Sequence, residues 1–463
     1  MQNEFVKRIY RLIKENNLLR EQNEALKIRV NELTEENDAF RLSFEELKDQ
    51  SLFLKKESDN TPSLRFNMVT ILFGYIHGFS KITDNSESKH LMDMLDSLLF
   101  QLNSIIEKYD IVRIKTIGDS LMVAGGIPIK NITNPIDVVL AAIEMQRAVD
   151  DCQYKQENGK IWDIKLGIHT GPVNATVSGT KKISYDLKGD TVNIVTRIES
   201  SGEIGKILIS ANTYELVKEF FECDHYGKMP IKYKGDIDLY SVKGLIPELS
   251  IDGNGREVND LFFTRFGSIQ FTDIQEMILD KLEKELPPYL YYHNVKHTVD
   301  VVTEVELIGW GEGCTDEEIL LLKTAALFHD VGHVKAYDNH EYHGTEMVRA
   351  MLPKYKYSKS QIDRICEIII ATKLPPKPKN LLEEIICDAD LDYLGRTDFI
   401  PVSNTLYREL KEINKIGTLN DWNKLQIKFI SGHQYFTKTA RGLREVNKQK
   451  QIERIMALID SEQ

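Results

Sequence analysis

The sequence lacks features that mark secreted and membrane proteins. Its five cysteines are scattered over 463 residues without a CxxC pair, which argues against a disulfide framework or a thiolate zinc site. Its apolar runs, such as Val69–Phe73 and Ala325–Phe328, are far shorter than the ~20 residues of a membrane span. The charged N-terminus has no apolar signal core. We therefore expect a cytoplasmic protein without a membrane partner.

The sequence also has fewer basic than acidic residues: 59 Lys and Arg compared with 71 Asp and Glu, which gives a net charge of −12. Proteins that bind nucleic acids usually carry a basic surface, so we expect no nucleic-acid partner. The negative net charge does not exclude a small anionic ligand, because cationic side chains or metal ions at the binding site can attract it. The length predicts two to four domains, because a single core stops growing beyond ~250–300 residues.

Residues 1–57 carry an unbroken seven-residue repeat of apolar side chains. The d positions are all apolar and read Phe5, Leu12, Leu19, Leu26, Leu33, Phe40, Leu47 and Leu54. Asn16, Asn23 and Asn37 occupy a positions, where Asn favours a two-stranded form. We predict a parallel dimeric coiled coil; a long amphipathic helix packed on its own domain is the alternative.

Residues 64–250 alternate between helix-like and strand-like segments. The helix-like segments are 91–108 and 136–150, and the strand-like segments are 68–73, 111–115, 121–124, 164–169 and 207–210. This alternation predicts an α/β (α+β) domain.

Four clusters in this domain are informative when taken together. They are residues 73–79 (FGYIHGF), 115–119 (KTIGD), 167–172 (GIHTGP) and 185–197 (YDLKGDTVNIVTR). In this order and at these distances they resemble class III adenylyl and guanylyl cyclases. The resemblance implies closure of a ribose 3′-hydroxyl onto the α-phosphate of a nucleotide, with magnesium or manganese ions held by two carboxylates.

By this resemblance Asp119 fits the second carboxylate position, whereas Tyr75 stands where the family has Asp. A phenol with a pKa of ~10 is a poor magnesium ligand. The resemblance assigns nucleotide binding to the adenine-reading pair Lys115 and Asp186, the ribose- and charge-stabilising pair Asn193 and Arg197, and a phosphate contact at Lys232 or Lys234. The alternative for Lys115 and Asp186 is ordinary surface charge.

Cyclase sites of this class form between two chains, so the resemblance implies a homodimer. A homodimer would carry Asp119 without its second carboxylate in both sites. We therefore favour a degenerate, nucleotide-binding regulatory domain. A heteromeric partner that supplies the missing Asp, or a tolerated one-carboxylate site, is the alternative.

Beyond a Gly-containing linker at 251–256, residues 259–463 have almost no strand signal. Helical patterns cover 274–286, 300–308, 317–328, 343–351, 361–371 and 404–416, and they predict an all-α domain. Six of the eleven histidines lie between His293 and His343. His with Asp is a usual ligand set for divalent metals, so this density predicts a metal site.

The order of these residues is a distant His, an adjacent His-Asp pair and a distant Asp, which resembles the HD-superfamily phosphohydrolases. The segment from Tyr292 to His297 also looks like that of cyclic-nucleotide phosphodiesterases. The metal ligands that the resemblance implies are His297, His329, Asp330 and Asp390. A water activated by manganese, iron, zinc or magnesium would then be the nucleophile.

Further residues complete the predicted site. His333, His340 and His343 are candidates for a second metal site, although a His-rich helix start can simply be solvated. His293, four residues before His297, would share its helical face and protonate a leaving alkoxide. Glu341 is a rival acid or base and Lys373 a candidate phosphate contact. Asp388 would point about 200° away from Asp390 on a helix, so we expect a structural role.

Three functions follow from these patterns. The first is a phosphohydrolase, with a small-molecule nucleotide as substrate, that is regulated by nucleotide binding to a degenerate cyclase domain. The second is a bifunctional enzyme that makes and degrades a cyclic nucleotide. The third is a non-catalytic nucleotide-sensing scaffold. The complete set of HD ligands weighs against the third, and Tyr75 weighs against the second.

Overall fold

The structure is a computed structural model that describes residues 63–77, 88–117, 119–154, 162–178, 184–231 and 235–460. The predicted coiled coil lies outside these residues. Contacts divide the chain into two units, residues 1–67 with 171–193 and residues 68–170 with 194–463. No helix among the described residues is long and apolar enough to cross a membrane.

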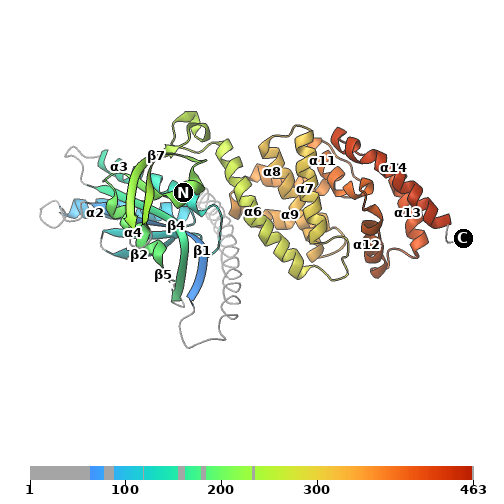
Figure 1. Ribbon diagram of the computed structural model, residues 1–463, viewed down its shortest axis with the longest axis horizontal. Helices are drawn as coiled ribbons and strands as arrows, with labels where there is room; N and C mark the ends of the chain where they lie inside the picture. The colour runs from blue at the N-terminus through green and yellow to red at the C-terminus, as the bar shows by residue number, and fades with distance from the viewer. Residues whose placement is uncertain are drawn as a thin grey trace, which may run out of the picture. The chain divides into compact units, whose positions relative to one another are not determined.

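The first half of the described chain alternates strands and helices (Figure 1). Its strands are β1 (Ser63–His77), β2 (Val112–Ile117), β3 (Ser120–Gly125), β4 (Asp163–Ser178), β5 (Ser184–Lys188), β6 (Ile207–Ser210), β7 (Phe221–Ile231) and β8 (Gly235–Leu245). Its helices are α2 (Ser88–Lys108), α3 (Asn134–Tyr154), α4 (Asp190–Ser201) and α5 (Ala211–Val217). This confirms the predicted α/β class for the region.

The strands form one sheet in the order β2-β3-β1-β4-β6-β8-β7, and β5 pairs with the end of β4. In the second unit, α2 and α3 bury Leu98 and Met145 against strand residues that include Leu72 and Val123. A separate core joins Ile198 of α4 to β6, β7 and β8. Two cores of this kind indicate helices on both faces of the sheet.

The register of β1 against β3 is important for the site. The two strands are antiparallel, and Tyr75 lies opposite Ser120. The main-chain N–H of Ile76 donates to the carbonyl of Asp119 at 2.9 Å. The Asp119 carboxylate is therefore held beside the Tyr75 side chain by backbone pairing.

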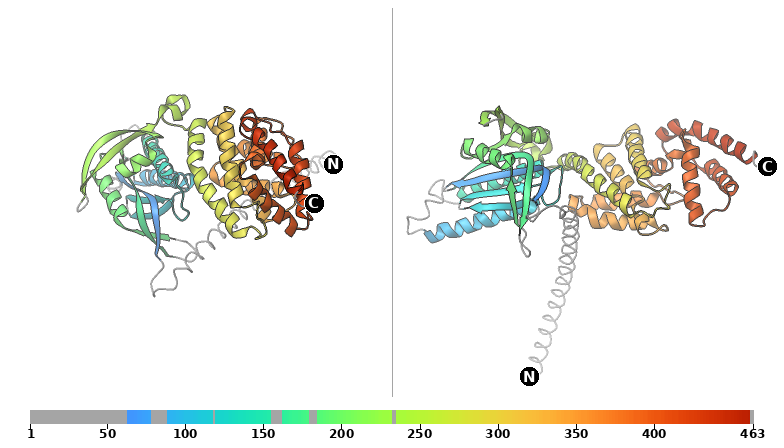
Figure 2. Two further views of the ribbon diagram at one scale, coloured as in Figure 1. Left: turned by 45° about the vertical axis from the view of Figure 1, so that its right-hand side comes forward. Right: turned by 60° about the horizontal axis from the view of Figure 1, so that its bottom comes forward.

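The second half of the described chain is helical and forms no β-strand, as predicted (Figure 2). Its helices are α6 (Asp260–Glu285), α7 (Val295–Gly311), α8 (Asp316–Phe328), α9 (His340–Met351), α10 (Lys359–Ala371), α11 (Leu381–Asp390), α12 (Phe399–Glu412), α13 (Leu419–Gly432) and α14 (Lys438–Asp460). The 3₁₀ helix η4 (Val331–Val334) follows α8 after His329 and Asp330, and the 3₁₀ helix η6 (Asp392–Gly395) follows α11 after Leu391.

Side-chain caps explain where several of these helices begin. Thr315 and Glu318 form a reciprocal capping box at the start of α8, and Ser358 and Gln361 form one at α10. Asn294 caps α7 by accepting the main-chain N–H groups of its first turn. The core behind the helices is mostly aliphatic and includes α8 from Ile319 to Phe328.

The predicted linker at 251–256 is not a free tether. Residues Ile251–Gly253 form a 3₁₀ turn, and the carbonyl of Gly255 accepts the N–H of Leu245 at 3.0 Å. The positive φ of Gly253 and Gly255 is the conformation that lets these residues form a compact turn.

Candidate functional site

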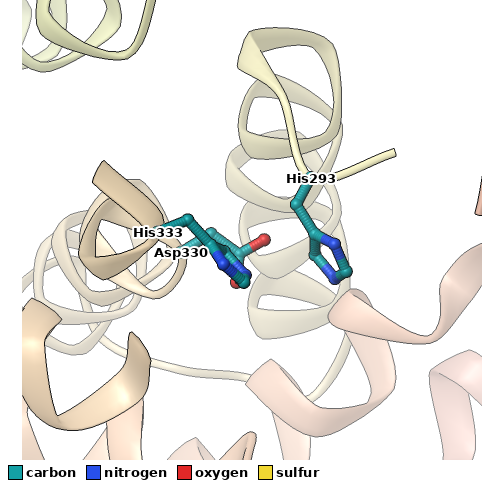
Figure 3. A group of neighbouring side chains, drawn as sticks. All are labelled: His293, Asp330 and His333. Atoms are coloured by element: carbon teal, nitrogen blue, oxygen red, sulfur yellow. The ribbon is translucent and has the colours of Figure 1, made fainter. Parts of the chain in front are cut away.

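Two groups of His and Asp side chains meet where α7, α8, η4, α9 and α11 converge. The first group contains His297, His329 and Asp390, and the second contains His293, Asp330 and His333. Within each group, the ligand atoms lie within 4.8 Å of one another. Figure 3 shows the second group, with Asp330 and His333 close together and His293 reaching toward them from a separate segment.

The first group has the geometry of a metal ligand set. His297 Nε2 lies 3.1 Å from Asp390 Oδ1 and 3.4 Å from Asp330 Oδ2. His329 Nε2 lies 3.3 Å from His297 Nε2 and 3.2 Å from Asp330 Oδ2. Atoms bound to one ion at ~2.0–2.2 Å are themselves roughly 3.0–3.5 Å apart, so these separations match a shared cation.

Local structure orients the two imidazoles of this group. His329 ends α8, and its Nδ1 donates to the Ala326 carbonyl at 2.7 Å, which leaves the Nε2 lone pair facing the group. His297 lies in the first turn of α7, where its main-chain N–H donates to the capping Asn294. Lone pairs and carboxylates that converge in this way repel one another unless a proton or a metal cation lies between them.

The second group is linked to the first through Asp330. Its Oδ1 lies 3.4 Å from His340 Nε2 and 3.9 Å from His333 Nε2, while its Oδ2 faces the first group. His340 Nδ1 donates to the Tyr337 carbonyl at 3.1 Å, so its Nε2 is also free to bind a cation. The rings of His333 and His340 stack with centroids 3.9 Å apart. One carboxylate thus spans both groups.

Orphaned polar atoms show that these residues fit a metal ion. Both ring nitrogens of His333 are buried without a hydrogen-bond partner. Burial lowers the pKa of His333 to about 2, which keeps the imidazole neutral as a ligand must be. A buried imidazole without any partner is costly in an apolar core, but it suits a coordination site.

The carboxylates of the site are ionised. Burial opposes charge on Asp330 and Asp390, but the surrounding histidines outweigh it and hold the pKa of both groups below the usual range. For His329, burial is likewise outweighed by Asp330 and Asp390, which raise its pKa well above the ordinary value. The site therefore concentrates negative charge that would attract a divalent ion.

His293 differs from its predicted place. Helix α7 begins at Val295, so His293 precedes the helix and does not share a helical face with His297. Its ring turns toward the second group, with its centroid 4.7 Å from that of His333. The prediction failed because the Asn294 cap ends the helical spacing on which it rested.

A functional residue that the sequence did not reveal fixes His293 in place. The Glu409 side chain on α12 is fully buried and accepts the main-chain N–H groups of Tyr292 at 2.9 Å and His293 at 3.1 Å. It also accepts a hydrogen bond from His293 Nδ1. Asn404–Ile416 was predicted as a helix, but nothing in that pattern distinguished Glu409 from surface charge.

Two more residues considered from the sequence, Asp388 and His343, do not belong to either group of ligand atoms. Asp388 is fully buried and accepts hydrogen bonds from Phe436 and Thr437 at 2.8–2.9 Å, so its predicted structural role is confirmed. His343, a candidate for a second metal site, lies outside both groups of ligand atoms, and its Nδ1 pairs with Glu346 at 3.0 Å.

Two other candidates are close to the second group without joining it. Glu341 is buried, with Oε1 3.7 Å from His340 Nε2. Lys373 Nζ donates to the side chain of Asn339 at 3.3 Å, just before α9.

A cavity of about 330 Å³ opens beside the first group. Its lining includes His297 and Asp390, and it is also lined by Tyr291, Tyr292, Asp300, Glu304, Tyr393 and Arg396. It thus gives the metal-ligand group access to a molecule of nucleotide size.

In the sheet domain, Tyr75 and Asp119 are partners. A hydrogen bond with Asp119, together with burial, raises the pKa of the Tyr75 hydroxyl. Asn193 and Arg197 are exposed four residues apart on α4. Lys115 is exposed on β2, and Asp186 is exposed on β5 with Lys188 Nζ at 3.6 Å. Lys232 and Lys234 lie outside the described residues.

Comparisons with known protein families decide the identity of both regions. The family model for the adenylate and guanylate cyclase catalytic domain matches residues 61–244, and the HD-domain model matches residues 294–392. The chain has a class III cyclase domain followed by an HD domain. Glu409 lies beyond the residues that the HD model matches, although its carboxylate contacts His293.

Curated relatives align with the cyclase domain. Guanylate cyclase 32E of Drosophila melanogaster is 34% identical over 43% of this chain, and human atrial natriuretic peptide receptor 2 is 31% identical over 41% of it. The chain spans only 18% of the length of each. The solved guanylate cyclase domain of RhGC from Catenaria anguillulae, in complex with GTP, is 29% identical with a TM-score of 0.35, covering 39% of this chain and 98% of that one.

Proposed function

We propose that the HD domain is a divalent-metal-dependent phosphohydrolase that acts on a nucleotide. The observation that carries the proposal is Asp330, whose two oxygens face two separate groups of histidines. His297, His329 and Asp390 would hold one ion, and His333 and His340 would hold a second. Bound ions would lower the pKa of water and neutralise charge on the phosphate.

The protein's own residues supply the proton for the leaving group. Glu409 holds His293 Nδ1, so the Nε2 nitrogen is the one that faces the second group. Burial opposes charge on His293, but Asp330 and Glu409 outweigh it and raise its pKa. His293 is therefore suited to hold a proton on Nε2 and to give it to a departing alkoxide.

A hydrolysis assay tests this proposal directly. The purified protein is incubated with manganese, magnesium or EDTA and with a panel of cyclic nucleotides, nucleoside monophosphates and nucleoside triphosphates, and products are identified by mass spectrometry. Asp330→Asn should reduce hydrolysis by several orders of magnitude, because both groups lose a ligand. The matched control is Asp363→Asn, since Asp363 is a surface carboxylate that pairs with Arg349.

The control variant should retain wild-type activity and metal content. Full activity in Asp330→Asn, or equal activity in EDTA and manganese, would refute the proposal. Circular dichroism of both variants separates a catalytic defect from a folding defect.

For the cyclase domain, we propose a regulatory nucleotide-binding role. What supports it is the hydrogen bond between Tyr75 and Asp119, because the one carboxylate faces a phenol rather than a second carboxylate. The positions that match base and ribose recognition, Lys115, Asp186, Asn193 and Arg197, are present. A bifunctional enzyme that also cyclises a nucleotide is the second candidate. Restoring the missing carboxylate distinguishes the two.

We also propose that this domain recognises adenine rather than guanine. One of the relatives is guanylate cyclase 32E, whereas Lys115 and Asp186 match the adenine-reading pair. Equilibrium binding of ATP and GTP to the intact protein would decide between them. ATP should bind more tightly; a preference for GTP, or no binding of either nucleotide, would contradict this part of the proposal.

A further inference from the structure

The cavity beside His297 and Asp390 has an unusual charge distribution for a site that receives phosphorylated molecules. Besides Asp390, four carboxylates line it, and they belong to Asp300, Glu304, Asp392 and Asp398. Only two lining residues, Lys296 and Arg396, are permanently cationic. The carboxylates therefore outnumber the cations in the wall of the cavity.

Both cations are already neutralised by the cavity's own carboxylates. Arg396 donates to both oxygens of Asp398, each at 2.8 Å, and its third nitrogen donates to Asp300 at 2.8 Å. Lys296 Nζ donates to the same Asp300 oxygen at 2.7 Å. A bidentate pair of this kind is rigid and strong, so Arg396 is not free to follow a phosphate chain.

The rest of the wall suits an uncharged group that donates hydrogen bonds. Glu304 and Asp392 each accept from Arg444 through one oxygen, and their second oxygens, Oε2 and Oδ2, are buried without a hydrogen-bond partner. The rings of Tyr292 and Tyr393 meet edge to face with centroids 5.3 Å apart, and Tyr291 also lines the cavity. Ribose hydroxyls and exocyclic amines can donate to such carboxylates, and a heterocycle can pack on aromatic rings.

From these contacts we infer that the cavity receives the uncharged nucleoside part of a substrate that carries a single phosphate. This inference rests on the proposed hydrolase function. The single phosphate would lie at the His and Asp groups, and no further phosphate would find a free cation in the cavity wall. Nucleoside triphosphates and other polyphosphates are therefore poor substrates, since their extra charges would face carboxylates.

The reaction balances with water alone. The oxygen of one water forms a bond to phosphorus, and the P–O bond to the nucleoside oxygen breaks. That oxygen takes the proton held by His293, and a proton from the attacking water passes to solvent.

The test compares kcat/KM for three substrates with the same base in the presence of manganese. They are the 3′,5′-cyclic mononucleotide, the nucleoside 5′-monophosphate and the nucleoside 5′-triphosphate. The better single-phosphate substrate should exceed the triphosphate at least ~100-fold, because each ~1.4 kcal/mol of like-charge repulsion is tenfold. Calorimetric binding of slowly hydrolysed phosphorothioate analogues should show the same order of affinity.

Charge variants then assign the preference to this cavity. Asp300→Asn and Asp398→Asn each release Arg396 from a carboxylate, so each should reduce the preference at least ~tenfold, mainly by improving the triphosphate. Asp363→Asn, which frees a surface arginine instead, should leave the preference unchanged.

The outcomes separate this inference from the function on which it rests. A triphosphate that is hydrolysed as well as the single-phosphate substrates, with activity lost in Asp330→Asn, would overturn the inference and retain the hydrolase. A preference that neither Asp300→Asn nor Asp398→Asn changes would overturn the role of the cavity. Absence of hydrolysis for every substrate, in wild type and Asp330→Asn alike, would overturn the hydrolase itself.

Discussion

Replacing Glu409 by Gln tests whether this buried carboxylate positions and charges His293. Glutamine has the same shape, and its amide oxygen can still accept the main-chain N–H groups of Tyr292 and His293. It loses the negative charge, and its NH₂ group cannot accept from His293 Nδ1. The substitution therefore removes one charge-assisted hydrogen bond while the cavity around it stays filled.

The size of the effect follows from that hydrogen bond. Bonds to charged groups contribute ~1.5–3 kcal/mol, against ~1 kcal/mol for neutral pairs. Loss of this difference, ~0.5–2 kcal/mol, favours neutral His293 and lowers its pKa by roughly 0.4 to 1.5 units. General acids contribute ~10²–10⁴-fold to rate, so we expect kcat to fall by roughly 100-fold, which is about 2.7 kcal/mol.

The pH profile gives the sign of the effect. A general acid must be protonated, so activity is lost as pH rises through its pKa. Because Glu409→Gln lowers the pKa of His293, the alkaline limb of the kcat profile should move to lower pH by roughly 0.4 to 1.5 units. A merely structural role would reduce kcat equally at every pH. Glu412→Gln on the exposed face of α12 is the matched control and should leave the profile unchanged.

Two results would refute this reasoning. An unchanged kcat and an unmoved alkaline limb in Glu409→Gln would show that His293 is not the proton donor. A fall in bound metal that accompanies the fall in kcat, measured by plasma mass spectrometry, would make His293 a metal ligand of the second group instead.

Three further predictions concern other parts of the chain. Burial, with Lys448 nearby, lowers the pKa of His433 from 6.5 to about 4, so about 2–3 kcal/mol of stability should be lost as pH falls from 6.5 to 4, and His433→Leu should flatten that loss in urea titrations. Tyr75→Asp should raise manganese-dependent cyclisation by restoring a carboxylate beside Asp119, measured by product mass spectrometry; robust wild-type cyclisation would favour the bifunctional enzyme. Leu19→Glu with Leu26→Glu should weaken the predicted dimer in sedimentation, and a monomeric wild type would contradict the coiled coil.

The parts of the fold that the sequence predicted well have strong local signals. Strand β6 covers Ile207–Ser210 as expected, because its unbroken apolar run is bounded by polar and turn residues. Helix α8 begins one residue before its expected start, since the Thr315–Glu318 capping box adds to an apolar pattern. The convergence of His297, His329 and Asp390 was expected because the resemblance to HD-superfamily phosphohydrolases implied that they share a metal ion.

Other features depend on long-range packing that no local pattern reports. Glu409 lies 116 residues after His293, and only the packing of α12 against the segment that precedes α7 brings them together. Helix α14 was not predicted, since its polar residues obscure the few apolar positions, such as Ile455, that it buries. His343 has the residue type of a ligand, yet its position on α9 directs it toward Glu346.

The central claim is that Asp330 joins two cation sites in the HD domain. Crystals grown with manganese and measured at the manganese absorption edge test it most directly. We expect an anomalous peak enclosed by His297, His329, Asp330 and Asp390, and a second peak on the Oδ1 side of Asp330 near His333 and His340. Absence of any peak among these side chains in crystals that contain manganese would contradict the claim.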